Sequence, residues 1–274
     1  MSQTGVVVTP EFIGSHDSAI FAVQYFPDGV LPAVHIIYIA PFGEEMNRSR
    51  ALVAKQARLF AQQGYSCTVF DFFGTGDSQG ELRHATLDLW LQNIQTVLSH
   101  LKAKADVPVV FWGVRFGGLL ALEFVNQSVI ETPRLVLWQP IISGKKYVTQ
   151  MLRLRIASQA SKGLNTETTD QIRDRLSQGE EIDVAGYPFN ATLINQIEER
   201  DIKNFSSLTG ATIDWFEFSV DNQPVSRAIS NAINTINQQG NQTRLHEFAS
   251  PPVWLLQKRH DSPELLEKTL GLNF

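Results

Sequence analysis

Three strand-length apolar runs, separated by segments with helical periodicity, constrain this chain more than any other feature of its sequence. The runs are VHIIYIA from Val34, SCTVFDF from Ser66 and VPVVFWG from Val107. Continuous apolar runs of this length are typical of strands that are buried on both faces. Such strands alternate with helices when a parallel sheet is covered on both sides. The sequence therefore predicts an α/β fold with a mainly parallel sheet.

The two segments between these runs have the period of amphipathic helices. Residues 50–64 place Val53 and Phe60 on one face, and Gly64 stands where a glycine ends a helix. Residues 87–101 carry a longer apolar stripe of the same period. The order strand, helix, strand, helix, strand follows from these patterns.

Further strand and helix patterns lie on both sides of this block. IFAVQYFP, from Ile20, alternates as an antiparallel edge strand does. RLVLWQP from Arg134, ATIDWFEFSV from Ala211 and the short run TRLHEF extend the series of strands. A final helix is introduced by Ser262 and Pro263. We expect a central sheet of about eight strands with helices on both faces.

One stretch, residues 145–205, interrupts the strand and helix rhythm. It contains helical pieces and the turn-rich segment GEEIDVAGYPFN. An insertion at this point lies above the carboxyl ends of the strands, where open α/β sheets bind ligands. We therefore expect residues 1–144 to form the first part of the core, residues 145–205 a helical lid, and residues 206–274 the second part of the core.

Composition and charge narrow the range of functions. The 274 residues are 43% hydrophobic and carry a formal net charge of −5, without a basic tail, so we expect no binding to nucleic acid. The one cysteine, Cys67, excludes an internal disulfide. The beginning of the chain has no signal-peptide pattern, and no run approaches the roughly 18 apolar residues of a membrane span. We expect a cytoplasmic protein without a transmembrane segment.

The sequence points to no cofactor and no metal. GTGDSQG lacks the third glycine of a dinucleotide-binding loop, and no phosphate-binding loop is present. The six histidines form no cluster with metal-ligand spacing. The oligomeric state is left open.

The segment FWGVRFGG follows the third apolar run and has the spacing of a nucleophile elbow. In a G-x-S-x-G elbow the central residue occupies a strained turn, and the flanking glycines avoid clashes with the strand and the helix. Gly113 and Gly117 take both flanking positions, but the central residue is Arg115. A guanidinium stays protonated and has no acceptor, so Arg115 can be neither a nucleophile nor a general base.

Two loops match the surroundings of an elbow. APFGEEMN follows the first buried run, where a loop supplies one backbone N–H to an oxyanion hole, and Phe42 and Gly43 are the candidates. The second N–H belongs to Phe116, directly after the elbow residue. The sequence thus predicts an anion pocket at the carboxyl end of the sheet.

These segments together resemble the α/β-hydrolase superfamily. PFGEEMNRSR, DFFGTGDSQGE, WGVRFGG, LWQPIISGKKYVTQMLRLR and EIDVAGYPFN are similar to the type 2 hydrolases that accompany exosortase A systems in bacteria. The resemblance covers nearly the whole chain. It implies an α/β-hydrolase fold with a helical lid and an association with exopolysaccharide production and sorting of surface proteins. Members of that family resemble one another in lacking the elbow serine, and their hydrolase name comes from the fold.

The acid and the histidine of a triad each have one candidate in the sequence, and each candidate has two possible roles. Asp221 follows a strand where a triad acid is expected, but it equally suits the cap of the next helix. The loop after TRLHEF, where the histidine is expected, contains none. His246 lies within that strand and is either a structural residue or a base that reaches the elbow by an unusual path.

Two roles remain open for Arg115. The elbow places it at a helix N-terminus, where a guanidinium favours a carboxylate or phosphate ligand. Alternatively Glu44 or Glu45 in the facing loop neutralises it, because a buried unpaired arginine is costly. A run of basic residues in the lid, with no acid between residues 145 and 162, either attracts an anion or forms a solvated helix face. Its members are Lys145, Lys146, Arg153, Arg155 and Lys162.

Two functions follow. The first is a hydrolase-fold protein without the serine mechanism. It binds either a ligand, which is an anionic or acyl-bearing small molecule or glycan, or a partner protein. The second is a hydrolase of esters or acyl groups that uses a relocated nucleophile, or a water activated by Asp221 or His246.

Overall fold

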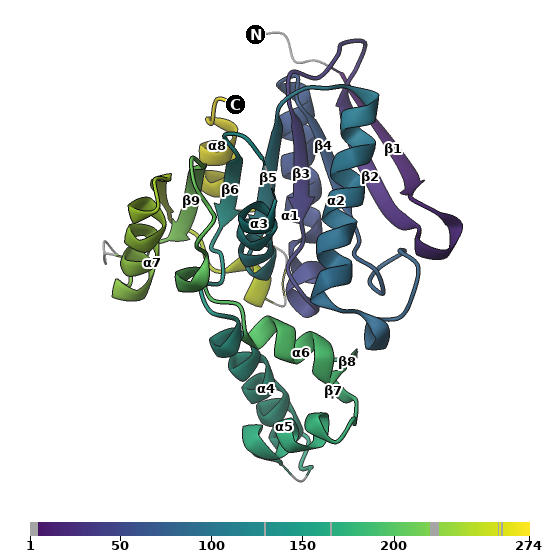
Figure 1. Ribbon diagram of the computed structural model, residues 1–274, viewed down its shortest axis with the longest axis vertical. Helices are drawn as coiled ribbons and strands as arrows, with labels where there is room; N and C mark the ends of the chain where they lie inside the picture. The colour runs from purple at the N-terminus through teal and green to yellow at the C-terminus, as the bar shows by residue number, and fades with distance from the viewer. Residues whose placement is uncertain (1–4, 129, 165, 220–224, 257, 259) are drawn as a thin grey trace.

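The apolar runs of the sequence form the centre of one sheet. The computed structural model describes residues 5–128, 130–164, 166–219, 225–256, 258 and 260–274 (Figure 1). The parallel strands are β3 (His35–Ile39), β4 (Ser66–Phe70), β5 (Val109–Val114), β6 (Arg134–Trp138), β9 (Thr212–Phe218) and β10 (Gln242–Phe248). The side chains of β3 are all buried, as its continuous apolar run predicted.

Two antiparallel strands complete the sheet at its N-terminal side. They are β1 (Val6–Ile13) and β2 (Ile20–Pro27), and the order within the described residues is β1-β2-β4-β3-β5-β6-β9-β10. The prediction that Ile20–Pro27 forms the edge strand was wrong, because β1 pairs along its outer side. Pro10 interrupts the strand pattern of β1, and an edge position is where a sheet accepts a proline.

Helices cover both faces of the sheet, so the predicted layering is confirmed. Helices α1 and α8 lie on one face, α2 and α3 on the other, and α7 beside β10 (Figure 1). Gly64 ends α1 as expected: its φ is +91°, and the Tyr65 N–H donates to the Phe60 carbonyl at 3.1 Å. The bounds are α1 (Glu44–Gln62), α2 (Leu87–Lys104), α3 (Phe116–Gln127), α7 (Arg227–Gln238) and α8 (Pro263–Leu270).

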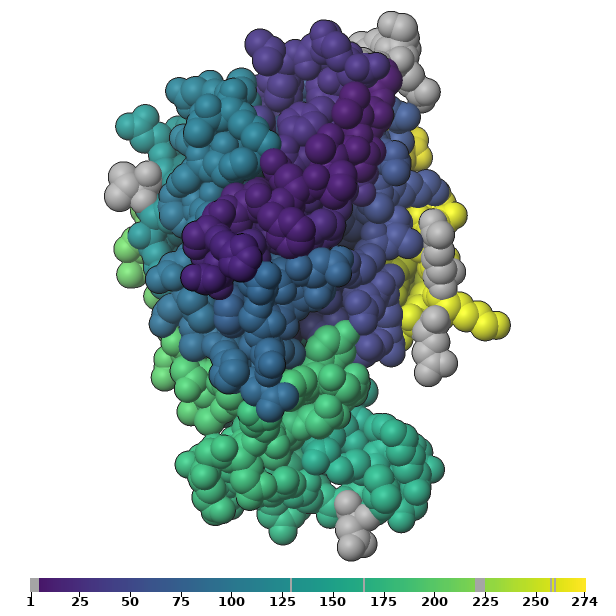
Figure 2. Space-filling model, turned by 90° about the vertical axis from the view of Figure 1, so that its right-hand side faces the viewer, coloured from purple at the N-terminus to yellow at the C-terminus, as the bar shows by residue number. Residues whose placement is uncertain are grey.

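The segment after β6 leaves the core and forms a layer beyond the carboxyl ends of the parallel strands (Figure 1). In the space-filling view this layer, in teal and green, projects from the body of the molecule (Figure 2). This layer begins at Gly144. A glycine is required at that position, because a Cβ would meet the Ile197 carbonyl oxygen. We call this layer the lid; it contains α4 (Gly144–Ser161), α5 (Thr169–Ser177), β7 (Ile182–Val184), β8 (Tyr187–Phe189) and α6 (Ala191–Glu198).

The hairpin in the lid is an addition to the prediction, which treated GEEIDVAGYPFN only as turn-rich. Strands β7 and β8 pair antiparallel, and Ala185 and Gly186 join them. Both residues have positive φ, +56° and +90°, as a two-residue turn of a tight hairpin requires. The sequence did not predict this turn, because it contains an alanine where asparagine or glycine is the usual residue.

The order of the strands creates a crevice at one point of the sheet. Both β4 and β5 lie beside β3, so the connections that leave β3 and β5 depart to opposite faces, to α1 and to α3. Such a point at the carboxyl ends of parallel strands is where open α/β sheets bind ligands. The elbow and the loop after β3 meet there.

Candidate functional site

Arg115 occupies a strained turn between β5 and α3. Its φ is +54° and its ψ −117°, a region that non-glycine residues rarely adopt. Two backbone hydrogen bonds hold it there. The Arg115 N–H donates to the Trp138 carbonyl at 3.0 Å, and the Arg115 carbonyl accepts from the Ile141 N–H at 3.0 Å. The backbone geometry of a nucleophile elbow is therefore present.

The two flanking glycines are required by this turn. A Cβ on Gly113 would lie 2.6 Å from the Gly117 carbonyl oxygen. A Cβ on Gly117 would lie 2.6 Å from the Ala40 carbonyl oxygen and closer still to that of Ile39. Backbone atoms on both sides leave no space for a side chain, as the G-x-R-x-G spacing predicted.

The Arg115 side chain turns to the loop after β3 and forms an internal ion pair. Its Nε donates to Glu45 Oε1 at 3.2 Å, and its Nη1 donates to the Gln139 carbonyl at 3.3 Å. The side chains of Arg115 and Glu45 are only 11% and 13% exposed. The guanidinium also lies 5.7 Å from the centre of the Trp254 ring, within reach of a cation–π interaction.

The two predicted acidic partners differ in their roles. Glu45 meets Arg115, whereas Glu44 is 43% exposed and pairs with Arg48 at 3.5 Å, one helical turn away. Burial raises the pKa of the Glu45 carboxyl, against the opposing effect of Arg115. The Tyr147 hydroxyl lies 3.5 Å from Glu45 Oε2, and burial raises the pKa of that phenol. Tyr147 is therefore a neutral donor to this carboxylate.

The predicted oxyanion donors lie beside the elbow. Phe42 and Phe116 are 4% and 1% exposed, and their ring centres are 6.0 Å apart. Within the described part of the chain, neither backbone N–H donates to a protein acceptor. Buried N–H groups are rarely left without a partner, so a carbonyl or carboxylate oxygen of a ligand is a suitable acceptor here. Gly43, with φ of +60°, turns the chain into α1 at this point.

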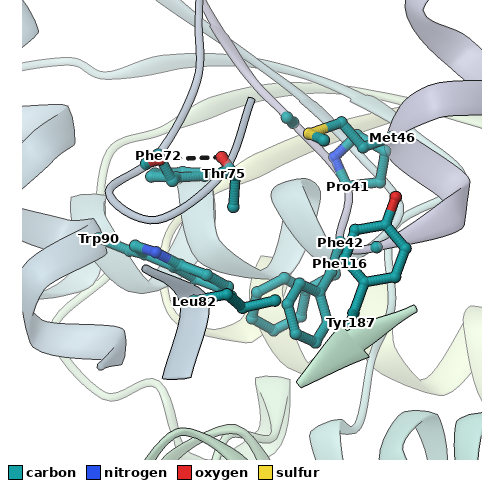
Figure 3. A pocket seen from close by; sticks show the side chains of 11 residues that line it. Pro41, Phe42, Met46, Phe72, Thr75, Leu82, Trp90, Phe116 and Tyr187 are labelled. Atoms are coloured by element: carbon teal, nitrogen blue, oxygen red, sulfur yellow. Dashed lines mark hydrogen bonds between the residues drawn. The ribbon is translucent and has the colours of Figure 1, made fainter. Parts of the chain in front are cut away.

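The core side of the elbow is closed. Phe42, Phe116, Trp90 and Tyr187 converge on a hollow there (Figure 3). Its volume is about 10 Å³, about the space of one water molecule. This hollow is too small to hold an acyl chain.

The lid side is open. A cavity of about 770 Å³ lies between α4, the β7–β8 hairpin and the loop after β10. Met151, Leu154, Val184 and Trp254 contribute apolar surface to its walls. Charged side chains line it as well: Glu44, Glu45, Arg48, Arg155, Lys162 and Asp183. Its volume falls within the 300–1,000 Å³ that is typical of small-molecule sites.

His246, the predicted base, does not meet the elbow. Its Nε2 lies 2.8 Å from Asp214 Oδ1, and its ring stacks on Phe216 at 4.6 Å. The register aligns His246 with Phe216, Trp138 and Val114, across three strand spacings. The backbones of His246 and Val114, the residue before the elbow, are therefore roughly 14 Å apart. The structure does not bring His246 and the elbow together.

The predicted acid, Asp221, lies outside the described residues. The nearest described carboxyl in the strand before it is that of Glu217, which accepts from Trp215 Nε1 at 3.0 Å. Burial raises the pKa of Glu217, while hydrogen bonds from Trp215 and Gln139 and the charge of Arg115 oppose this rise. Glu45 pairs directly with the guanidinium, whereas Glu217 is influenced only by its charge.

Several site residues were not found from the sequence. Trp254 stands in the loop after β10, where a triad histidine was expected, and Tyr147, Gln139 and Glu217 come from three other elements. An aromatic residue or an amide near a strand end is common in any chain. Only the tertiary contacts with Arg115 and Glu45 identify these four.

The described ranges contain neither a membrane-spanning helix nor a metal-binding cluster. No helix there is long and apolar enough to cross a membrane. No group of three or more histidine, cysteine or acidic side chains in this part of the chain is placed to hold a metal ion.

Comparisons with known proteins agree with this geometry. The family described as Serine aminopeptidase, S33, matches residues 36–186. The human mitochondrial palmitoyl-protein thioesterase ABHD10 is 31% identical over 88 residues, which are 32% of this chain and 27% of that protein. This chain thus matches about a quarter of the relative's length.

Solved structures resemble nearly the whole chain. Est1E from Butyrivibrio proteoclasticus, with ferulic acid bound, has a TM-score of 0.61 at 17% identity and covers 95% of this chain and 94% of its own. DcsB in complex with a substrate analogue has a TM-score of 0.62 at 16% identity, over 96% and 97%. These likenesses confirm the predicted α/β-hydrolase fold.

Proposed function

The chain belongs to the serine aminopeptidase S33 family of the α/β-hydrolase superfamily, and from this premise we propose that it binds an acyl-bearing ligand without the serine mechanism of a hydrolase. The ligand lies in the cavity between the lid and the core, with its polar end toward the elbow. One observation carries the proposal: the elbow residue is an arginine, and Glu45, with which it pairs, lines a cavity of about 770 Å³.

The chemistry of the elbow supports binding over covalent catalysis. Arg115 cannot attack a carbonyl carbon, because its guanidinium stays protonated and has no lone pair to donate. The loop that would supply the general base contributes Trp254 instead. The backbone N–H groups of Phe42 and Phe116 have no protein acceptor in the described residues, and they suit a ligand carbonyl or carboxylate.

The biological setting is proposed from the sequence motifs. The five segments that resemble exosortase-associated hydrolases support a role in exopolysaccharide production or surface-protein sorting. Acyl and glycan intermediates of such systems suit a cavity that both apolar and charged side chains line. We place the protein in the cytoplasm, where it binds such a ligand without a cofactor.

Covalent reactivity and acyl binding provide the test. We expect no labelling by a serine-directed fluorophosphonate and no turnover of short or medium acyl esters. We expect dodecanoate to bind, and butanoate to bind far more weakly, in isothermal titration calorimetry, because each buried methylene contributes about 0.8 kcal/mol.

A cavity variant and a matched control locate the binding site. Met151→Trp adds bulk to the apolar wall of the cavity and should weaken dodecanoate binding, whereas Leu164→Trp, at an exposed lid position outside it, should not. Arg115→Ser tests whether the elbow alone restores labelling. Covalent labelling of the unmodified protein would contradict the proposal.

The second candidate is a hydrolase of acyl esters or thioesters. It is favoured by the thioesterase relative and by the two free oxyanion N–H donors. Water activated by Asp221 or His246, or a relocated nucleophile, would then carry the reaction. Turnover of palmitoyl thioesters that is lost in Asp221→Asn or His246→Gln, with folding unchanged, would establish it. Turnover equal in both variants and the unmodified chain would exclude these two bases.

A further inference from the structure

We propose that the lid carries a headgroup site for a phosphate or another anion, formed by Lys145, Lys146 and Arg153, next to the mouth of the acyl cavity. The ligand is then a single amphiphile, with its chain in the cavity and its anionic end on the outer face of α4. This inference rests on the proposed function and specifies its ligand. It assigns the anion to the lid, away from Arg115.

A second hollow lies on the lid, beside the acyl cavity. It is a shallow groove open to solvent, and all five residues that line it belong to α4: Lys145, Lys146, Thr149, Gln150 and Arg153. Gln150 lines both this groove and the acyl cavity. The two spaces are therefore neighbours, separated by the width of one side chain.

Helix geometry explains why the two spaces adjoin. Tyr147, Met151 and Leu154 are three or four residues apart and face the cavity. Lys146, Gln150 and Arg153 form the next row of α4 and face the groove. A ligand that leaves the cavity beside Leu154, which is 58% exposed, meets the basic row within one helical turn.

The charges of the groove are not neutralised within the chain. No ion pair involves Lys145, Lys146 or Arg153 in the part that the structure describes. Of the other cations near the cavity, Arg155 pairs with Glu167 at 3.3 Å and Arg115 pairs with Glu45, whereas Lys162 has no ion pair within the described residues. A protein of net charge −5 thus presents unpaired positive charge on its lid, and three of these cations lie together in the groove. An anion binds there without displacing an internal carboxylate.

The test compares two amphiphiles with the same chain. Dodecyl phosphate and dodecyl maltoside, both below their micelle concentrations, are titrated into the full chain by calorimetry at low and moderate salt. We expect dodecyl phosphate to bind at least about ten-fold more tightly, since charge-assisted hydrogen bonds contribute this much or more. Added salt should weaken only dodecyl phosphate, because the groove is open to solvent.

Matched variants separate the two parts of the site. Lys146→Gln with Arg153→Gln should remove the advantage of dodecyl phosphate and leave dodecyl maltoside within two-fold. Lys102→Gln with Arg227→Gln removes the same charge at exposed positions outside the lid and should change neither affinity. Met151→Trp should weaken binding of both amphiphiles. Melting temperatures establish that each variant is folded.

Three outcomes would overturn the inference, and they are distinguishable. Equal affinity for both amphiphiles, unchanged in Lys146→Gln with Arg153→Gln, removes the headgroup site but leaves acyl binding intact. Failure of both amphiphiles to bind removes the proposed function as well. Binding to phosphatidylglycerol vesicles that Met151→Trp does not weaken, without binding of dissolved dodecyl phosphate, would make the groove a membrane-docking surface instead.

Discussion

Arg115 combines a strained backbone with a paired side chain, and both depend on single neighbours. Breaking a buried ion pair by removing one partner leaves an uncompensated charge, which costs about 3 kcal/mol or more. Arg115 and Glu45 are each nearly buried, and no other carboxylate pairs with Arg115 in the described residues. The elbow arginine is therefore as much a structural residue as a site residue.

We expect Glu45→Gln to lower the free energy of unfolding by about 3 kcal/mol in urea denaturation. Glu44→Gln is the matched control, because its exposed pair with Arg48 contributes about 0.5 kcal/mol or less. Arg115→Met with Glu45→Gln removes both charges and should be less destabilising than the sum of the two single changes. Equal effects of Glu44→Gln and Glu45→Gln would contradict the internal pair.

The elbow glycine Gly117 gives a second prediction at this scale. Gly117→Ala places a Cβ against the Ile39 and Ala40 carbonyl oxygens, and backbone atoms cannot move aside as a side chain can. We expect a loss of about 3 kcal/mol in stability, measured by thermal or urea unfolding. Gly271→Ala is the control, since its φ is −73° and its nearest contact is 3.5 Å. A Gly117→Ala protein of unchanged stability would show that the loop after β3 can move away from the added Cβ.

Among the elements, the β7–β8 hairpin decides the shape of the acyl cavity. Val184, Ala185, Gly186 and Tyr187 all line that cavity. The turn holds an alanine at φ of +56°, where a Cβ costs roughly 1 kcal/mol. Ala185 thus makes the turn of this cavity-lining hairpin less stable than a glycine would.

Ala185→Gly should stabilise this hairpin by about 0.5–1 kcal/mol, because glycine adopts positive φ without a steric cost. Amide hydrogen exchange in β7 and β8 provides the local measurement. Ala232→Gly, within α7, is the opposite control and should destabilise by about 1 kcal/mol. Faster exchange in the Ala185→Gly hairpin would mean that the alanine side chain makes a stabilising contact in the cavity wall.

At the scale of the whole molecule, buried carboxyls make stability depend on pH. Burial raises the pKa of Glu217 above its ordinary value of 4.5, so the folded state holds a proton that the unfolded state releases. The associated stability is fully present below pH 4.5 and declines as the pH rises through the folded pKa. Glu45 contributes in the same direction.

We expect Glu217→Gln to reduce this decline, so that its stability relative to the unmodified protein increases from pH 4.5 upward. The glutamine can still accept the Trp215 Nε1 hydrogen bond. Urea unfolding at several pH values measures the effect. Glu247→Gln, at the aligned and exposed position of β10, is the matched control for loss of one carboxylate. A relative stability of Glu217→Gln that does not change with pH would contradict a raised pKa.

The sequence alone determined the layers of the fold, because strand and helix periods are local properties. The runs from Val34, Ser66 and Val107 became buried parallel strands, and the helices between them fell on opposite faces. Gly113 and Gly117 marked the elbow, since only a strained turn needs glycines at that spacing. The edge strand was misplaced because Pro10 obscured the pattern of β1.

The tertiary structure decided what meets Arg115. Glu44 and Glu45 are adjacent in the sequence, but residues next to each other on a helix point about 100° apart, so only Glu45 reaches the guanidinium. Trp254 comes to the same place from a position 139 residues along the chain, 254 minus 115. Local patterns fix the backbone of the elbow. The partner of its side chain depends on which distant segments the sheet brings to one end, and no local period encodes that.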